Sequence, residues 1–187
     1  LSIEERKLLF PLAKKERREI ACKVFKLKEG DVFEGEVEFI DVSNSTKSST
    51  KSAHNNALSH FHAIILHTNK PEETIARYCW LTDQSSPRRI FGSSWQVRLD
   101  QQKIIVCSEE DAERIVPSVD VSNLPSILGY ALLTESLSKT KDCFSHNELA
   151  LQSLNRGSFL VKLPEFISGN LIIGTSAADF PWNGDFN

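Results

Sequence analysis

The sequence lacks the features that would place it in several large classes of protein. Its four cysteines include no Cys-x-x-Cys pair, so the usual zinc-binding signature is absent. No apolar run is long enough to cross a bilayer, and no signal-like apolar block is present. No methionine occurs, even at the first position, which fits a fragment of a longer chain or a sequence from which methionines have been lost. We expect an intracellular protein, cytoplasmic or nuclear, with reduced cysteines.

Motifs of the common enzyme families are also missing. The sequence contains no Gly-x-Ser-x-Gly, His-Glu-x-x-His, P-loop or Gly-x-Gly-x-x-Gly pattern. Its net charge of −3 gives no overall basic field for nucleic acid. The charge is uneven, with nine Lys or Arg against five Asp or Glu in residues 1–30, and five against eleven in residues 108–187. This asymmetry predicts head-to-tail contacts, so we expect a homo-oligomer or a protein partner.

The apolar residues that are present predict mainly strands. Phe33, Val37 and Phe39 alternate with glutamates over residues 31–42, which predicts an antiparallel strand with one face in water. The same reasoning predicts further strands at residues 21–27, 58–68, 74–82, 95–99, 103–107, 158–163 and 170–174. Capping residues and helical spacing predict helices at residues 2–13, 109–116, 124–132 and 149–154.

These elements predict an α+β protein. We expect an antiparallel β-rich core, as a sheet, sandwich or partly open barrel, with a helical segment packed on it. Residues 1–20 form a basic helical segment in this prediction, residues 21–174 a single domain, and residues 175–187 an aromatic tail. Within the domain we expect a β-rich part, a helical part and closing strands at residues 21–107, 108–156 and 157–174. The Ser- and Lys-rich residues 43–56 predict a long mobile loop that is dispensable for folding.

One pair of histidines has the spacing of metal ligands. His60 and His62 lie two apart in a predicted strand, so both side chains point to one face. A His-x-His pair on a strand resembles the metal motif of the cupin family, without that motif's flanking glycines. The same face carries Ile64 and Leu66, which favours a structural role at the edge of the core. We expect no bound cofactor, and a metal-dependent enzyme that uses the histidine pair is our third hypothesis.

Basic and aromatic residues are mixed in the middle of the chain. A strand-rich barrel that carries both kinds can bind single-stranded nucleic acid through phosphate contacts and base stacking. The candidates for such a surface are Arg77, Tyr78, Trp80, Arg88, Arg89, Trp95 and Arg98. A nucleic-acid-binding module is therefore our second hypothesis.

The C-terminal tail is rich in large aromatic residues and has few other apolar residues. Such a tail either packs on its own domain or docks on a neighbouring chain, where the basic N-terminal segment has the complementary charge. The side chains that would make this second contact are Phe180, Trp182 and Phe186 on the tail and Lys14, Lys15, Arg17 and Arg18 on the basic segment. Our leading hypothesis is a non-enzymatic interaction or assembly protein that acts through protein–protein contacts and self-association.

Overall fold

The computed structural model describes most of the chain and contains two compact units. The described residues are 2–11, 17–27, 38–41, 55–84, 86–117, 119, 124–164 and 169–183. The first unit is Leu1–Ser52 and the second is Ala53–Asn187.

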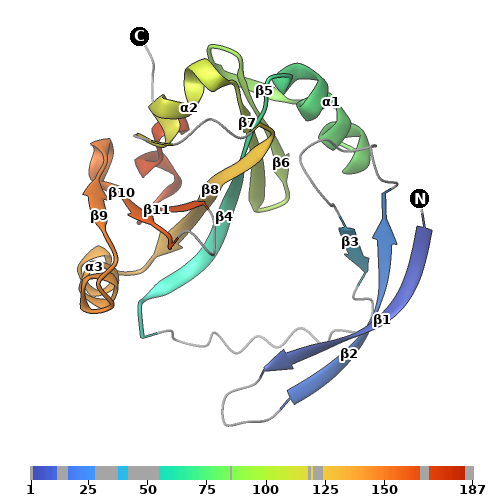
Figure 1. Cartoon of the computed structure of the whole chain (residues 1–187), viewed down its shortest axis with the longest axis horizontal. Helices are drawn as coiled ribbons and strands as arrows, with labels where there is room; N and C mark the ends of the chain where they lie inside the picture. Colours follow the sequence, from blue (N-terminus) through green and yellow to red (C-terminus); the bar gives the residue numbers. More distant parts are fainter. Residues whose placement is uncertain are drawn as a thin grey trace. The chain divides into compact units, whose positions relative to one another are not determined.

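The described residues of the first unit form a three-stranded antiparallel sheet. Its strands are β1 (Ser2–Pro11), β2 (Arg17–Lys26) and β3 (Glu38–Asp41), in that spatial order (Figure 1). The predicted helix at residues 2–13 is wrong, because β1 pairs with β2 along its whole length and cross-strand pairing outweighs local helix propensity. Most of the predicted strand at residues 31–42 and of the predicted loop at residues 43–56 lies outside the described residues.

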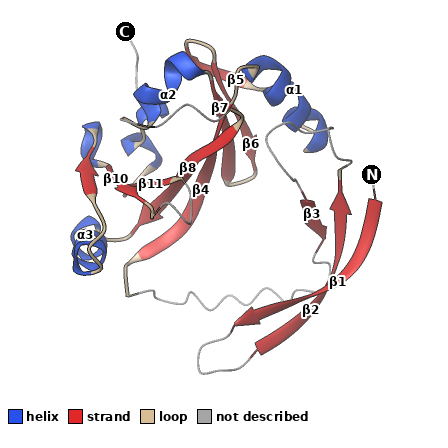
Figure 2. Cartoon of the chain, in the orientation of Figure 1, coloured by secondary structure: helices blue, strands red, loops and turns tan. Residues whose placement is uncertain are grey.

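The second unit consists of two halves with the same order of elements, strand–helix–three strands. The first half contains β4 (Leu58–His67), α1 (Pro71–Leu81), β5 (Arg88–Phe91), β6 (Ser94–Leu99) and β7 (Gln102–Cys107). The second half contains β8 (Ser126–Thr134), α3 (Leu137–His146), β9 (Leu151–Ser153), β10 (Phe159–Lys162) and β11 (Asn170–Gly174). All eight strands form one sheet in the order β5-β6-β7-β4-β8-β11-β10-β9 (Figure 2).

The two halves also have matching strand pairings. In each half the first strand runs parallel to the last, β4 beside β7 and β8 beside β11, while the other neighbours are antiparallel. The antiparallel pair β4 and β8 joins the halves at the centre of the sheet. A short helix, α2 (Glu109–Ile115), follows the first half, and two 3-10 helices, Ala177–Asp179 and Pro181–Asn183, follow the second. The α+β class is confirmed, in the form of a single mixed, mostly antiparallel sheet with helices packed on it.

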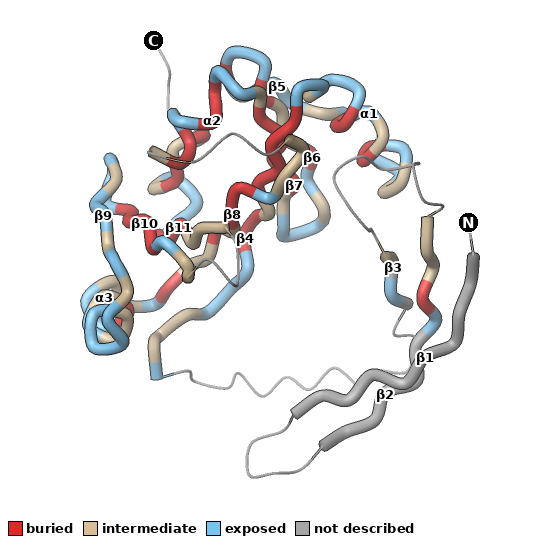
Figure 3. Tube along the Cα trace, in the orientation of Figure 1, coloured by how far each residue is buried: buried red, intermediate tan, exposed pale blue. Residues whose placement is uncertain are grey.

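Different elements cover the two faces of this sheet, and the buried residues follow its central strands (Figure 3). Helix α1 packs on one face of the first half, and α3 packs on the same face of the second half. Helix α2 and the C-terminal segment cover the opposite face, which we call the α2 face. Its core contains Ala63, Ile65, Ile105, Cys107, Ala112, Ile115, Leu128, Ala131, Leu160, Ile172, Phe180 and Trp182.

Several predicted elements are confirmed. Strand β4 is central, β6 and β7 form the predicted hairpin, α2 begins after Ser108, and β10 and β11 are the closing strands. No described helix is long and apolar enough to cross a membrane.

Two predicted elements of the second unit have the opposite structure. The strand expected at residues 74–82 is helix α1, which starts with Pro71 and two glutamates and buries Thr74, Ile75, Tyr78 and Cys79 on one side. The helix expected at residues 124–132 is strand β8. Its apolar residues fit a helical repeat only because this central strand is apolar on both faces and its pairing with β4 is interrupted by bulges.

The end of the predicted helical region also differs from the structure. The helix expected at residues 149–154 is replaced by strand β9, and α3 lies before it, ending at His146. Ser136 caps α3 by accepting a hydrogen bond from the backbone N–H of Lys139. The sequence pattern at residues 145–148 resembles a helix start, but these residues end one helix instead.

Candidate functional site

Three cationic side chains lie on neighbouring strands at one edge of the sheet. Arg98 on β6 is directly opposite Lys103 on β7, and Arg88 on β5 is opposite Gln96, two residues from Arg98. Residues that face each other across antiparallel strands point to the same side of a sheet. We call Arg88, Arg98 and Lys103 the basic row.

The basic row lies on the α2 face of the sheet. Lys103 alternates in phase with Ile105 and Cys107, both of which belong to the core under α2. Val97 packs with α1 on the other side, so Arg98 points away from α1. Arg88 and Arg98 are exposed and Lys103 is half-buried, which leaves the row open to solvent at its outer end.

No acidic side chain among the described residues neutralises this row. The Arg98 Nε donates a hydrogen bond to the backbone oxygen of Asp100 at 2.8 Å, and the Lys103 Nζ lies 3.5 Å from the Asn183 Oδ1. Neither acceptor carries a full charge. Burial lowers the pKa of Lys103, and the charges of Arg98 and Arg88 lower it further. The three cations therefore interact unfavourably with one another.

A stack of aromatic rings adjoins the inner end of the basic row. The ring of Phe180 lies between His62 and Trp182, with centroid distances of 5.0 and 5.1 Å and interplanar angles of 17° and 6°. Burial lowers the pKa of His62 to about 4, and the charge of Lys103 contributes to this shift. His62 is therefore neutral at physiological pH. The His62 Nε2 and the Trp182 Nε1 are buried without a hydrogen-bond partner among the described residues.

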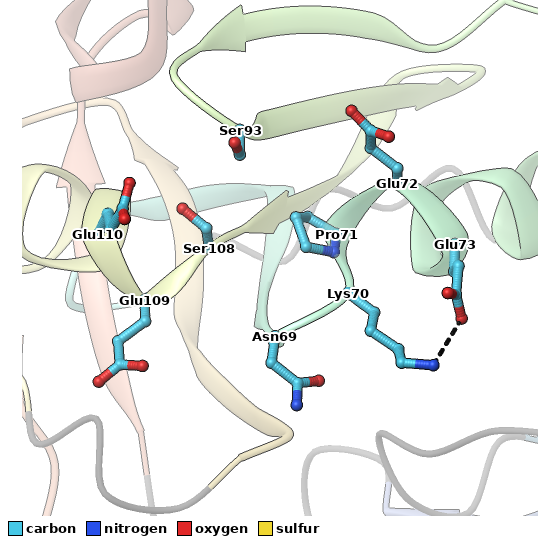
Figure 4. A pocket seen from close by; sticks show the side chains of 9 residues that line it. All are labelled: Asn69, Lys70, Pro71, Glu72, Glu73, Ser93, Ser108, Glu109 and Glu110. Atoms are coloured by element: carbon cyan, nitrogen blue, oxygen red, sulfur yellow. Dashed lines mark hydrogen bonds and ion pairs between the residues drawn. The ribbon is translucent and has the colours of Figure 1, made fainter.

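A second polar feature lies at the opposite end of β7. An open hollow of about 510 Å³ is lined by Asn69, Lys70, Pro71, Glu72, Glu73, Ser93, Ser108, Glu109 and Glu110 (Figure 4). Lys70 forms an ion pair with Glu73 at 3.1 Å, and the other three glutamates, Glu72, Glu109 and Glu110, make the lining acidic. The buried Asp111 carboxylate accepts hydrogen bonds from the Ser93 N–H and the Ser94 hydroxyl, both at 2.8 Å, and holds the β5–β6 turn against α2.

The predicted nucleic-acid surface is divided between different parts of the second unit. Arg77, Tyr78 and Trp80 lie on α1, where Tyr78 is buried and Trp80 is 80% exposed. The adjacent Arg88 and Arg89 point to opposite faces of β5. Arg89 donates to the backbone oxygen of Gly92 and stacks over Trp95, on the side away from Arg98. The seven candidates therefore do not share one surface.

The predicted histidine pair differs in burial. His60 is opposite Leu133, which packs against the core of the α2 face, and the pairing of β4 with β8 shifts just after it, between Phe61 and Ala63. His60 is exposed, whereas His62 is 7% exposed and stacks on Phe180. Within the described ranges, no group of three or more His, Cys, Asp or Glu residues is arranged to hold a metal ion.

The predicted docking residues are only partly described. Phe180 and Trp182 are 0% and 2% exposed and pack on their own unit, one of the two arrangements considered for the tail. Phe186, Lys14 and Lys15 lie outside the described residues, as do the side chains of Arg17 and Arg18.

Sequence reasoning found two members of the basic row but missed Lys103. The available signal was the predicted hairpin itself, because its turn at residues 100–102 brings Arg98 opposite Lys103. Two like charges facing each other across a hairpin are unfavourable, so such a pair indicates a site that needs a counter-charge.

Comparisons with known proteins give structural similarities only. No protein-family model and no curated protein matches the sequence. Methylmalonyl-CoA epimerase of Mycobacterium tuberculosis is 7% identical with a TM-score of 0.46, over 63% of this chain and 87% of the epimerase. Lactoylglutathione lyase of Agrobacterium tumefaciens is 12% identical with a TM-score of 0.27, over 62% and 92% of the two chains. An integron cassette protein of V. cholerae is 12% identical with a TM-score of 0.26, over 62% and 93%.

Two of these three structures are named as enzymes, and that finding contradicts our leading hypothesis of a non-enzymatic interaction or assembly protein. The hypothesis and its nucleic-acid-binding alternative are not retained.

Proposed function

We propose that the second unit binds a small anionic ligand, one that carries a phosphate or carboxylate group, on the basic row. The observation that carries this proposal is the placement of Arg88, Arg98 and Lys103 on three adjacent strands, with no acidic partner among the described residues. An anion placed between them would remove the mutual repulsion that lowers the pKa of Lys103.

The chemistry of the side chains fits a phosphate or carboxylate. An arginine guanidinium presents two parallel N–H groups that match the oxygens of either anion, and an ammonium group adds a point charge. Arg98 already uses its Nε on Asp100, which fixes the side chain and leaves its terminal N–H groups for a ligand. The exposure of Arg88 and Arg98 gives an anion direct access from solvent.

Titration calorimetry of the full chain with inorganic phosphate tests this proposal. We expect Arg98→Gln and Arg88→Gln each to weaken binding about tenfold, since a charge-assisted hydrogen bond contributes roughly 1.5–3 kcal/mol and about 1.4 kcal/mol is tenfold. Arg89→Gln is the matched control, because Arg89 is adjacent in sequence but lies on the other face of β5. Equal affinities for the Arg88 and Arg89 variants, or no phosphate binding by the parent chain, would overturn the proposal.

A further inference from the structure

Phe180 occupies a slot shaped for a flat ring. It is the middle member of three nearly parallel rings, with His62 on one side and Trp182 on the other. All three rings are buried, and Phe180 has no exposed surface. A slot with aromatic walls on both sides binds planar groups by offset stacking.

The slot lies next to the basic row. Asn183, which follows Trp182 directly, lies 3.5 Å from the ammonium group of Lys103. Lys103 also pairs with Ala63, the neighbour of His62 in β4. A ligand whose anionic group binds Lys103 and Arg98 would therefore have the rest of its structure directed to the position of Phe180.

The walls of the slot carry polar atoms that the protein itself leaves unpaired. The His62 Nε2 and the Trp182 Nε1 are buried without a partner among the described residues, although buried polar atoms are normally hydrogen-bonded. The phenyl ring of Phe180 offers neither atom a hydrogen bond. A ring that bears polar substituents would satisfy groups that Phe180 cannot.

The segment that fills the slot is short. Phe180 lies outside the sheet, between the single-turn helices Ala177–Asp179 and Pro181–Asn183, so its side chain can leave the slot without the movement of a strand, while Trp182 stays as a wall. We infer that the slot is the binding site for a flat aromatic ring of the anionic ligand, and that Phe180 is an internal stand-in which the ligand displaces. This inference rests on the proposed binding of anions by the basic row and specifies the ligand as an aromatic anion.

Two probes that differ only in the ring test the inference. Methyl phosphate and phenyl phosphate are titrated into the full chain, and the three tryptophan indole N–H signals are followed by NMR. We expect phenyl phosphate to bind at least tenfold more tightly than methyl phosphate and to shift the Trp182 signal, which methyl phosphate leaves in place. Phe180→Leu removes the flat ring while keeping an apolar side chain of similar size, and we expect it to strengthen the binding of phenyl phosphate alone.

The control is Phe159→Leu, an equally buried phenylalanine on the α3 side of the sheet, which we expect to change neither affinity. If methyl phosphate binds and phenyl phosphate binds no more tightly, the aromatic slot is disproved while the basic row stands. If Phe159→Leu and Phe180→Leu have the same effect, the slot is disproved as well. If neither probe binds, both the slot and the basic row are wrong.

Discussion

The two halves of the second unit share one plan but differ in what their outer strands present on the α2 face. In the first half, Arg98 at the end of β6 is opposite Lys103. At the corresponding place in the second half, Lys162 at the end of β10 is opposite Asn170, whose side-chain amide donates to the backbone oxygen of Leu128 at 2.8 Å. The strand pairings are thus the same in both halves, whereas the facing pair of cations is present only in the first.

The α2 face of each half is also covered in the same way. Each is followed by a short helical segment that packs on this face, α2 after β7 and the 3-10 helices after β11. Both segments meet in one core that includes Ile115, Leu128 and Phe180. The two halves therefore share the same backbone arrangement. The segment after β11 adds Phe180 and Trp182, whose rings adjoin the basic row of the first half.

The largest effect is expected where the two halves join. Leu128 on β8 is 2% exposed and packs in the core that both halves share. We expect Leu128→Ala to lower the free energy of unfolding by about 2–5 kcal/mol, measured by urea denaturation. Because β4 and β8 connect the halves, circular dichroism and tryptophan fluorescence should report one coincident transition. Two separate transitions would show that the halves unfold independently.

Two glycines with positive φ provide a sharper comparison of the halves. Gly92 (φ +47°) lies in the β5–β6 turn of the first half, and Gly157 (φ +85°) lies before β10 in the second. A Cβ at Gly157 meets nothing within 4 Å, so Gly157→Ala carries only the cost of the backbone conformation, about 1–2 kcal/mol. A Cβ at Gly92 would overlap the Asp111 carboxylate as well, and we expect Gly92→Ala to cost about 2–4 kcal/mol.

Thermal or urea unfolding of both glycine variants gives the two values. A cost for Gly92→Ala no larger than that for Gly157→Ala would mean that the Asp111 contact with the turn contributes little. We expect the double variant Gly92→Ala with Asp111→Ala to be no more stable than Gly92→Ala alone. Removing the Asp111 carboxylate relieves the overlap with the new Cβ, but it also removes the acceptor of the hydrogen bonds from Ser93 and Ser94.

Acid conditions should destabilise the second unit by protonating His62, which is buried against Phe180 on the α2 face. The pKa of His62 falls from 6.5 to about 4 on folding, so the unfolded chain binds a proton near pH 6.5 that the folded chain does not. The stability contributed by neutral His62 is fully present above pH 6.5 and is lost as the pH falls from 6.5 toward 4. We expect a fall of about 2–3 kcal/mol over this range.

The pH dependence of urea unfolding checks this expectation. Burial also lowers the pKa of His67, so His62→Gln should remove a part of the fall rather than all of it. His60→Gln is the matched control, because its exposed side chain lies two residues away on the same strand. An unchanged pH profile for His62→Gln would show that this imidazole is not kept neutral by the fold.

The sequence could predict those elements in which one signal dominates. Alternation predicted the β6–β7 hairpin, and the acids after Ser108 predicted α2. It could not predict β8, because a strand that is apolar on both faces and bulged at Leu128 has no clear period. The candidate site could not be predicted either, because it depends on the register in which β5, β6 and β7 pair. Arg88 and Arg98 are visible as charges in the sequence, but only the pairing of β5, β6 and β7 shows that they share a face with Lys103 and that Arg89 does not.

The smallest effect is expected at the counterpart of the basic row. Lys162 is exposed and lies on the α2 face, because Phe159 and Val161 alternate with it and pack toward α3. It thus matches Arg98 in position, but its partner across the strands is the neutral Asn170. One cation without a second makes a weak anion site, since an isolated exposed pair of charges contributes only about 0–1 kcal/mol, whereas several neighbouring charges act together. We therefore expect Lys162→Gln to leave the affinity for inorganic phosphate unchanged within the error of calorimetry, while Arg98→Gln weakens it. A loss of affinity in Lys162→Gln as large as that in Arg98→Gln would mean that phosphate responds to the overall charge of the unit rather than to the arrangement of one half.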